Sequence, residues 1–146
     1  MKSAYVWKTI ADPFLGKYSL IKVCSGVIKS DDTLLNVEKG EEERLNKLYV
    51  LEGSKPIEVP ELHAGDIGAI AKLNTVATGD TLSTRTTPVV FGKTEISVPY
   101  TCKRYKTVNK GDEDKISQAL AKIMSEDRTV RVENDGANRQ SLIYGM

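Results

Sequence analysis

The chain has 146 residues, of which 40% are hydrophobic and 28% charged, and its formal net charge at pH 7 is +1. This composition is typical of one ordinary folded domain or two small ones, and it argues against a disordered chain. The near-zero charge gives no overall field that would attract nucleic acid, and no apolar run approaches the roughly 20 residues that cross a bilayer. The N-terminus has no apolar signal region, so a cytoplasmic protein with no membrane partner is expected.

Short strands separated by turns are predicted through the first half of the chain. The expected strands cover residues 5–10, 18–28, 33–37, 46–51, 56–59 and 66–73. A turn at Asp12-Pro13 follows the first strand, Gly26 is a natural position for a bulge or bend, and the small residues of 66–73 indicate close packing in a barrel. No helical period interrupts these strands, so the pattern indicates a closed β-barrel.

One highly charged segment breaks the pattern. Residues 38–44 read Glu-Lys-Gly-Glu-Glu-Glu-Arg, which is too charged to lie inside a barrel. We therefore expect a solvated loop that projects from the barrel.

The pattern changes after the polar segment 84–88, which ends in a proline. A boundary here gives two predicted domains, residues 1–88 and residues 89–146. In the second, a strand is expected over 96–102, then a helix, a strand over 129–133, a turn over 134–137 and a strand over 141–144. The order strand, helix, strand, strand is three quarters of a ferredoxin-like split β-α-β unit.

The predicted helix has clear signals at both ends and along one face. Asp112 is the expected N-cap, and the carboxylates of Glu113 and Asp114 favour the positive end of the helix dipole. The helix should end within residues 125–127. Apolar residues recur at i, i+3, i+4 and i+7 and predict one buried face made of Ile116, Ala119, Leu120 and Ile123.

The residue types that build metal and redox sites are sparse. Cys24 and Cys102 are far apart, no CxxC pair occurs, and His63 is the one histidine. We expect no metal site, two reduced thiols that are buried or idle, and a His63 that lies at the surface or at a strand edge.

Three motifs in the first domain, in this order, resemble the second domain of elongation factor G, a ribosomal GTPase. They are residues 8–17 (Lys-Thr-Ile-Ala-Asp-Pro-Phe-Leu-Gly-Lys), 64–67 (Ala-Gly-Asp-Ile) and 79–82 (Gly-Asp-Thr-Leu). Residues 111–120, 126–132 and 142–146 are similar to the helix start, the second strand and the glycine-methionine corner of the third domain of that family. The resemblance covers nearly the whole chain and runs through two domains in the family order.

The chain also departs from the family pattern at three places. Arg128 stands where the family commonly has a proline, and Glu41-Glu42-Glu43 is more acidic than the family's loop. The glycine-glutamate-leucine-histidine helix that follows the corner in the family is not in this chain, which ends at Met146. The resemblance therefore implies a mainly β protein, in which a translation-factor β-barrel precedes a truncated ferredoxin-like segment.

The function implied by the resemblance is mechanical rather than catalytic. No GxxxxGK[ST] motif occurs, so no cofactor is expected in this chain, and GTP would bind in a preceding domain of the parent protein. The resemblance implies that the barrel packs on the GTPase domain and contacts the ribosome, while the third domain relays GTP-state changes during translocation. The barrel cations that are plausible partners for ribosomal RNA phosphates, or are ordinary solvated side chains, are Lys29, Lys39, Arg44 and Lys47.

The aspartates of the three motifs are better explained as turn residues than as catalytic acids or bases. Asp12, Asp66 and Asp80 each lie at a predicted strand edge, and we expect their carboxylates to accept hydrogen bonds from the backbone rather than to catalyse. Gly65 and Gly79 are expected to relieve backbone strain at the same turns.

Several alternative functions stay open from the sequence. Within the superfamily, ribosome-protection proteins that confer tetracycline resistance share the architecture. A free-standing barrel that binds single-stranded nucleic acid would need exposed aromatic side chains in a basic groove, yet Tyr5, Trp7, Tyr18 and Tyr49 fall in strand patterns that predict core. An enzyme barrel with an inner cofactor pocket is disfavoured because no polar cluster converges in the sequence.

The missing last helix and strand of the second domain have a physical consequence. Part of a sheet face and one sheet edge should be uncovered, which invites pairing with another copy. We expect self-association, or the barrel, to cover Val98, Tyr100 or Leu142.

Overall fold

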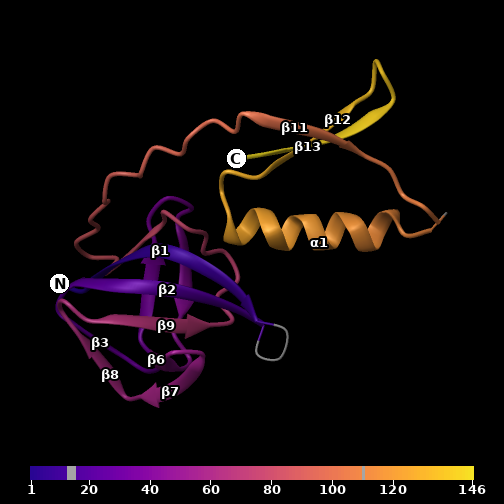
Figure 1. Ribbon diagram of the computed structural model, residues 1–146. Coiled ribbons are helices and arrows are strands. Elements are labelled where there is room, and N and C mark those ends of the chain that lie inside the picture. Colours follow the sequence, from indigo (N-terminus) through magenta and orange to yellow (C-terminus); the bar gives the residue numbers. More distant parts are fainter. Residues whose placement is uncertain (13–15, 110) are drawn as a thin grey trace. The chain divides into compact units, whose positions relative to one another are not determined.

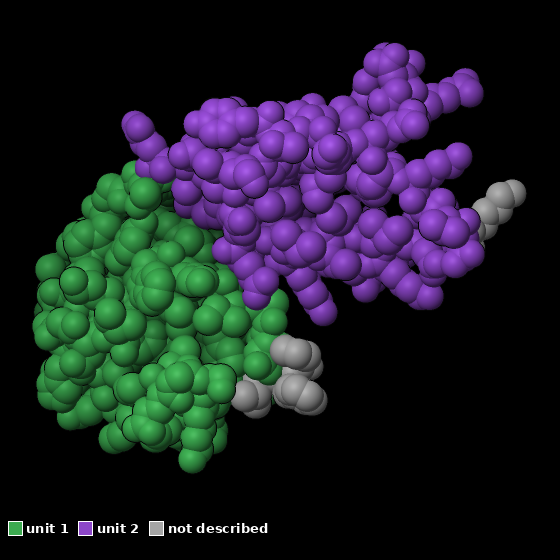
Figure 2. Space-filling view, in the orientation of Figure 1, with its two compact units in different colours: residues 1–94 green, residues 95–146 purple. Residues whose placement is uncertain are grey.

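The computed structural model describes residues 1–12, 16–109 and 111–146 (Figure 1). The chain divides into two compact units, residues 1–94 and residues 95–146 (Figure 2). The turn predicted at Asp12-Pro13 lies largely outside the described residues.

The first unit is built from strands. These are β1 (Ser3–Asp12), β2 (Gly16–Ser25), β3 (Val27–Lys29), β4 (Thr33–Asn36), β5 (Glu41–Arg44), β6 (Leu48–Glu52), β7 (Lys55–Val59), β8 (Glu61–His63), β9 (Ile67–Ala71) and β10 (Thr81–Ser83). Eight of them form one antiparallel sheet in the order β5-β4-β10-β1-β2-β9-β6-β7, and β3 pairs with β8. The mainly β fold predicted from the sequence is confirmed, although β5 and β8 were not foreseen.

The sheet wraps around one apolar core. The largest fully buried side chains include Ile21, Ile28, Leu48, Ile70 and Leu82, which come from strands far apart in the sequence. Burying each such side chain contributes about 1.5–3 kcal/mol, so this core is the main source of stability.

Two glycines are required by the close packing of this unit. Gly26, at φ +74°, separates β2 from β3, and a Cβ at this position would lie 2.5 Å from the backbone oxygen of Met1. At Gly68 in β9, a Cβ would lie 2.3 Å from a side-chain carbon of Leu62. The bend predicted at Gly26 and the tight packing predicted for residues 66–73 are both confirmed.

The aromatic residues predicted for the core lie instead on the outer side of the sheet. Ala4 and Val6 point into the core, so Tyr5 and Trp7, which alternate with them along β1, point outward. Tyr18 and Tyr49 pack edge-to-face in a second cluster, outside the main core, with ring centroids 5.9 Å apart. The core prediction is therefore confirmed for Tyr18, which is 5% exposed, and was wrong for Trp7, which is 41% exposed. It failed at Trp7 because aromatic content was read without the alternation that assigns each residue to a face.

The prediction of a projecting charged loop at residues 38–44 was partly wrong: residues 37–40 form a turn, but the rest of the segment is a strand. Residues 41–44 form β5, which pairs with β4, and Glu43 is only 5% exposed. Its Oε1 accepts hydrogen bonds from the backbone N–H of Thr75 (2.5 Å) and from the hydroxyl of Thr75 (2.7 Å). A buried carboxylate is tolerated where donors of this kind replace its water.

The second unit contains one helix and three strands. They are β11 (Thr101–Tyr105), α1 (Glu113–Glu126), β12 (Arg131–Asp135) and β13 (Gln140–Gly145), and the sheet order is β11-β13-β12. This is the predicted strand-helix-strand-strand order. The first strand begins later than predicted, because pairing starts with Thr101 opposite Gly145 and residues 96–100 face no partner strand in the described chain.

The helix begins after Asp112 and ends before Asp127, as predicted, but Asp112 makes no capping hydrogen bond with its side chain. Ile116 and Leu120 are half-buried as expected, whereas Ala119 is exposed and Ile123 is 43% exposed. The predicted face was therefore partly wrong: the row at i, i+4 and i+8, which ends at Met124, is the one that turns away from solvent.

Among the described residues, no helix is long and apolar enough to cross a membrane. Cys24 and Cys102 are free thiols, and both are exposed rather than buried.

Candidate functional site

The four candidate contact cations lie on the barrel, and each is paired with a carboxylate. Their partners are Glu61 for Lys29 (3.4 Å), Asp80 for Lys39 (3.5 Å), Asp31 for Arg44 (2.9 Å) and Glu58 for Lys47 (2.8 Å). The pairs of Lys29, Arg44 and Lys47 are exposed and contribute only about 0–1 kcal/mol each, so a phosphate can replace the carboxylate there at small cost. Asp80, the partner of Lys39, is buried.

Two of the pairs shift the pKa values of their members. The hydrogen bond to Glu58 raises the pKa of Lys47. Hydrogen bonds from Lys29 and then from His63 lower the pKa of Glu61, whose Oε1 lies 3.1 Å from His63 Nε2. His63 lies exposed on β8, as predicted, and its backbone N–H donates to Asp66.

Lys29 and Arg44 are brought to one turn, residues 29–32. The Oδ2 atom of Asp32 accepts hydrogen bonds from Lys2 Nζ (2.5 Å) and from the backbone N–H of Lys29 (2.7 Å). Burial disfavours the ionised form of Asp32, but the two hydrogen bonds outweigh it and lower its pKa. The backbone N–H of Leu45 donates to the Asp32 carbonyl, which fixes the turn beside the end of β5.

Lys39 belongs to a different group of polar residues around the segment 73–80, between β9 and β10. Asp80 is 5% exposed and accepts hydrogen bonds from Asn36 (2.9 Å) and from the backbone N–H of Ala77 (2.9 Å). Lys39 donates to the carbonyl of Thr75 and Lys17 to that of Val76. Asp66 and Asp80 therefore bond to backbone groups of their turns, as predicted.

Burial and the charges around this segment shift the pKa of Lys17. Burial and the nearby charge of Lys39 lower the pKa of Lys17, while Asp80 and Glu43 act in the opposite direction. Gly79, at φ +94°, donates its N–H to Val6. No local sequence signal indicated this cluster, because its members are brought together only by the barrel.

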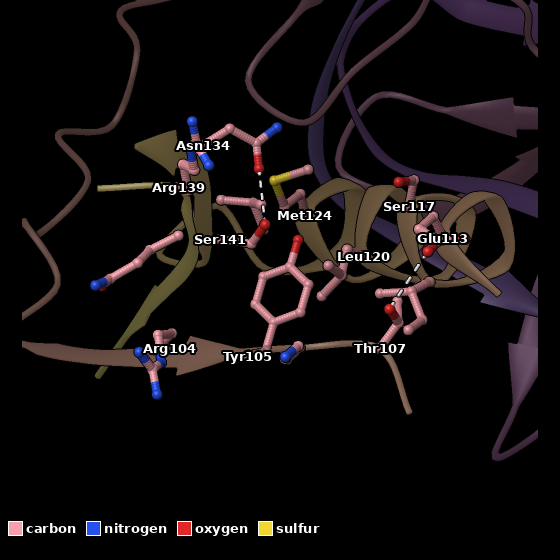
Figure 3. Close-up of a pocket in the computed structure, with 14 residues that line it drawn as sticks. Arg104, Tyr105, Thr107, Glu113, Ser117, Leu120, Met124, Asn134, Arg139 and Ser141 are labelled. Carbon is pink, nitrogen blue, oxygen red and sulfur yellow. Dashed lines mark hydrogen bonds between the residues drawn. The ribbon is translucent and has the colours of Figure 1, made fainter. Parts of the chain in front are cut away.

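The second unit contains a hollow of about 650 Å³ between α1 and its sheet (Figure 3). Tyr105 points into it, and Leu120 and Met124 of the helix lie on the opposite side. The hydroxyl of Ser141 bonds to Asn134 (3.1 Å), and Thr107 donates to Glu113 (3.4 Å).

Neither unit offers a metal centre among the described residues: no group of three His, Cys, Asp or Glu side chains converges. The clusters above fix turns and link strands.

The profile of elongation factor G domain 2 matches residues 1–85, and the profile of elongation factor G domain III matches residues 96–146. The chain belongs to the elongation factor G family. A crystal structure of a protein from Thermus thermophilus is similar over 99% of this chain, with a TM-score of 0.84 and 28% sequence identity. The chain spans 22% of the length of that protein.

Proposed function

We propose that the chain is the non-catalytic middle part of a translational GTPase that contacts the ribosome and relays GTP-state changes during translocation. The observation that supports this proposal is the presence of domain 2 and domain III of elongation factor G, in that order, in one chain. In this proposal GTP binds to a preceding domain of the parent, the barrel packs on that domain, and the protein works in the cytoplasm.

The proposed contacts are those of Lys29, Lys39, Arg44 and Lys47, which exchange their carboxylate partners for phosphates of ribosomal RNA. For Lys29, Arg44 and Lys47 the exchange replaces one exposed ion pair with another, so affinity arises mainly from the release of counterions from RNA. We therefore expect weak, salt-sensitive binding by this part of the protein alone.

Co-sedimentation with purified ribosomes through a sucrose cushion tests the proposal. The chain is expected to pellet with ribosomes at low salt and to be released as salt rises, and Arg44→Glu or Lys47→Glu should weaken pelleting. Lys55→Glu, which changes an exposed lysine with no ion pair among the described residues, is the matched control. Failure to pellet at low salt, or equal loss in the control, would contradict ribosome contact through these cations.

A further inference from the structure

The outward face of β1, β2, β9 and β6, called here the outer wall, carries an aromatic and basic surface that includes none of the four contact cations of the proposed function. Register places Lys8 beside Leu20, Leu20 beside Ala69, and Ala69 beside Tyr49, in one row across the four strands. With strands ~4.8 Å apart, this row is ~14 Å long.

Trp7 and Lys8 are both exposed because the pairing of β1 with β2 slips between Val6 and Lys8. Trp7 is 41% exposed. A bulge commonly re-aims a side chain out of the sheet. Here it presents an indole ring and an ammonium group next to each other.

A second cation and apolar side chain lie next to this pair. Lys22 is opposite Tyr5 on β1 and opposite Ile67 on β9, and Ile67 is 58% exposed. The ammonium groups of Lys8 and Lys22 have no ion-pair or hydrogen-bond partner among the described residues, although the backbone carbonyl of Lys22 accepts a hydrogen bond from Cys24. The one carboxylate at the outward positions of these four strands, Asp12, lies at the far end of β1.

The small amount of apolar surface exposed on the outer wall favours a nucleic-acid base over a protein as its partner. Tyr18 and Leu20 are only 5% and 6% exposed, and they pack in one cluster with Ile10, Tyr49 and Leu51. A stable protein interface needs about 800 Å² from each partner, including a well-filled apolar centre. Stacking of a base requires one accessible ring, and a nearby lysine then meets the phosphate.

We propose that the outer wall binds single-stranded RNA, with a base stacked on Trp7 and the flanking phosphates held by Lys8 and Lys22. This site is separate from the four paired cations of the proposed function. Binding to a free oligonucleotide can therefore be present or absent whether or not the chain pellets with ribosomes.

The probe is a fluorescein-labelled 12-nucleotide oligouridylate, followed by anisotropy at low salt, with Trp7 emission recorded in parallel. We expect saturable binding with quenching of Trp7, which is the one tryptophan of the chain. Trp7→Ala should weaken binding at least about tenfold and Trp7→Phe much less, because phenylalanine keeps a stacking face. Lys8→Ala and Lys22→Ala should each weaken binding and reduce the slope of log K against log salt by about 0.7.

Lys55→Ala is the matched control. Pro56 lies opposite Leu51, which faces outward, so the neighbouring Lys55 lies on the face of β7 that points away from the outer wall. It should leave the affinity within about twofold of the unchanged chain. Three results would overturn the proposal: no binding of the oligouridylate, binding that Trp7→Ala leaves intact, or an equal loss in Lys55→Ala. The first of these would favour a protein as the partner of the wall.

Discussion

The three consecutive glutamates of β5 differ sharply in what they contact, and this makes them a test of the barrel's polar cluster. Glu43 is 5% exposed and accepts two hydrogen bonds from Thr75, whereas Glu41 is exposed. Glu43→Ala removes the acceptor and leaves the backbone N–H of Thr75 without a partner. A buried unsatisfied donor costs about 1–3 kcal/mol, so we expect a loss of about 2 kcal/mol in the free energy of unfolding.

Urea denaturation followed by the emission of Trp7 measures this loss, because Trp7 lies in the first unit, which also contains Glu43. Thermal unfolding gives a second measurement of the same loss, since 1 kcal/mol corresponds to a fall of about 4–8 °C in Tm for a unit of this size. Glu43→Gln should cost less than Glu43→Ala, since the amide oxygen still accepts. Glu41→Ala is the matched control and should change stability by less than about 0.5 kcal/mol. Equal losses at positions 41 and 43 would refute the assignment of Glu43 to a buried strand position.

Three further predictions follow from contacts in the two units. The pKa of Asp32 is lowered in the folded chain, so its contribution to the free energy of unfolding, up to about 1 kcal/mol, is present above the ordinary pKa of 3.8 and is lost as pH falls through the folded pKa. In urea titrations from pH 7 to pH 2, Asp32→Asn should be less stable than the unchanged chain at neutral pH and equally stable in acid. A difference in stability that stays constant with pH would contradict this. Gly26→Ala should lower Tm more than Gly40→Ala, since both have a positive φ but only Gly26 has the Met1 oxygen against its Cβ position, and equal shifts would count against that contact. Tyr100 is 85% exposed, and self-association of the second unit should appear in sedimentation velocity and fall in Tyr100→Ser, whereas a monomer at all concentrations would contradict it.

Secondary structure was predictable from the sequence wherever one local signal dominated. The helix was located by the acidic residues of its first turn and by its apolar period, and the bend at Gly26 by a glycine inside a strand pattern. The order of the two folds came from the resemblance to elongation factor G, which the family matches confirm.

The remaining features depend on contacts between residues far apart in the chain. Glu43 was expected in a loop because a carboxylate in a strand is costly unless donors meet it, and its donor, Thr75, comes from a segment 32 residues away. Lys8 follows the outward-facing Trp7 and is exposed as well, because of a bulge that is visible only in the pairing of β1 with β2. The contact cations were chosen by charge alone, and their carboxylate partners became visible only in the folded chain.

The coding sequence on both sides of this chain tests the central proposal most directly. If the chain is the middle of a translational GTPase, a GxxxxGK[ST] motif precedes it and a Gly-Glu-Leu-His-Leu continuation follows Met146. A start codon at Met1 together with a stop codon directly after Met146 would contradict the account, because the chain would then be an independent small protein with the fold of two elongation factor G domains.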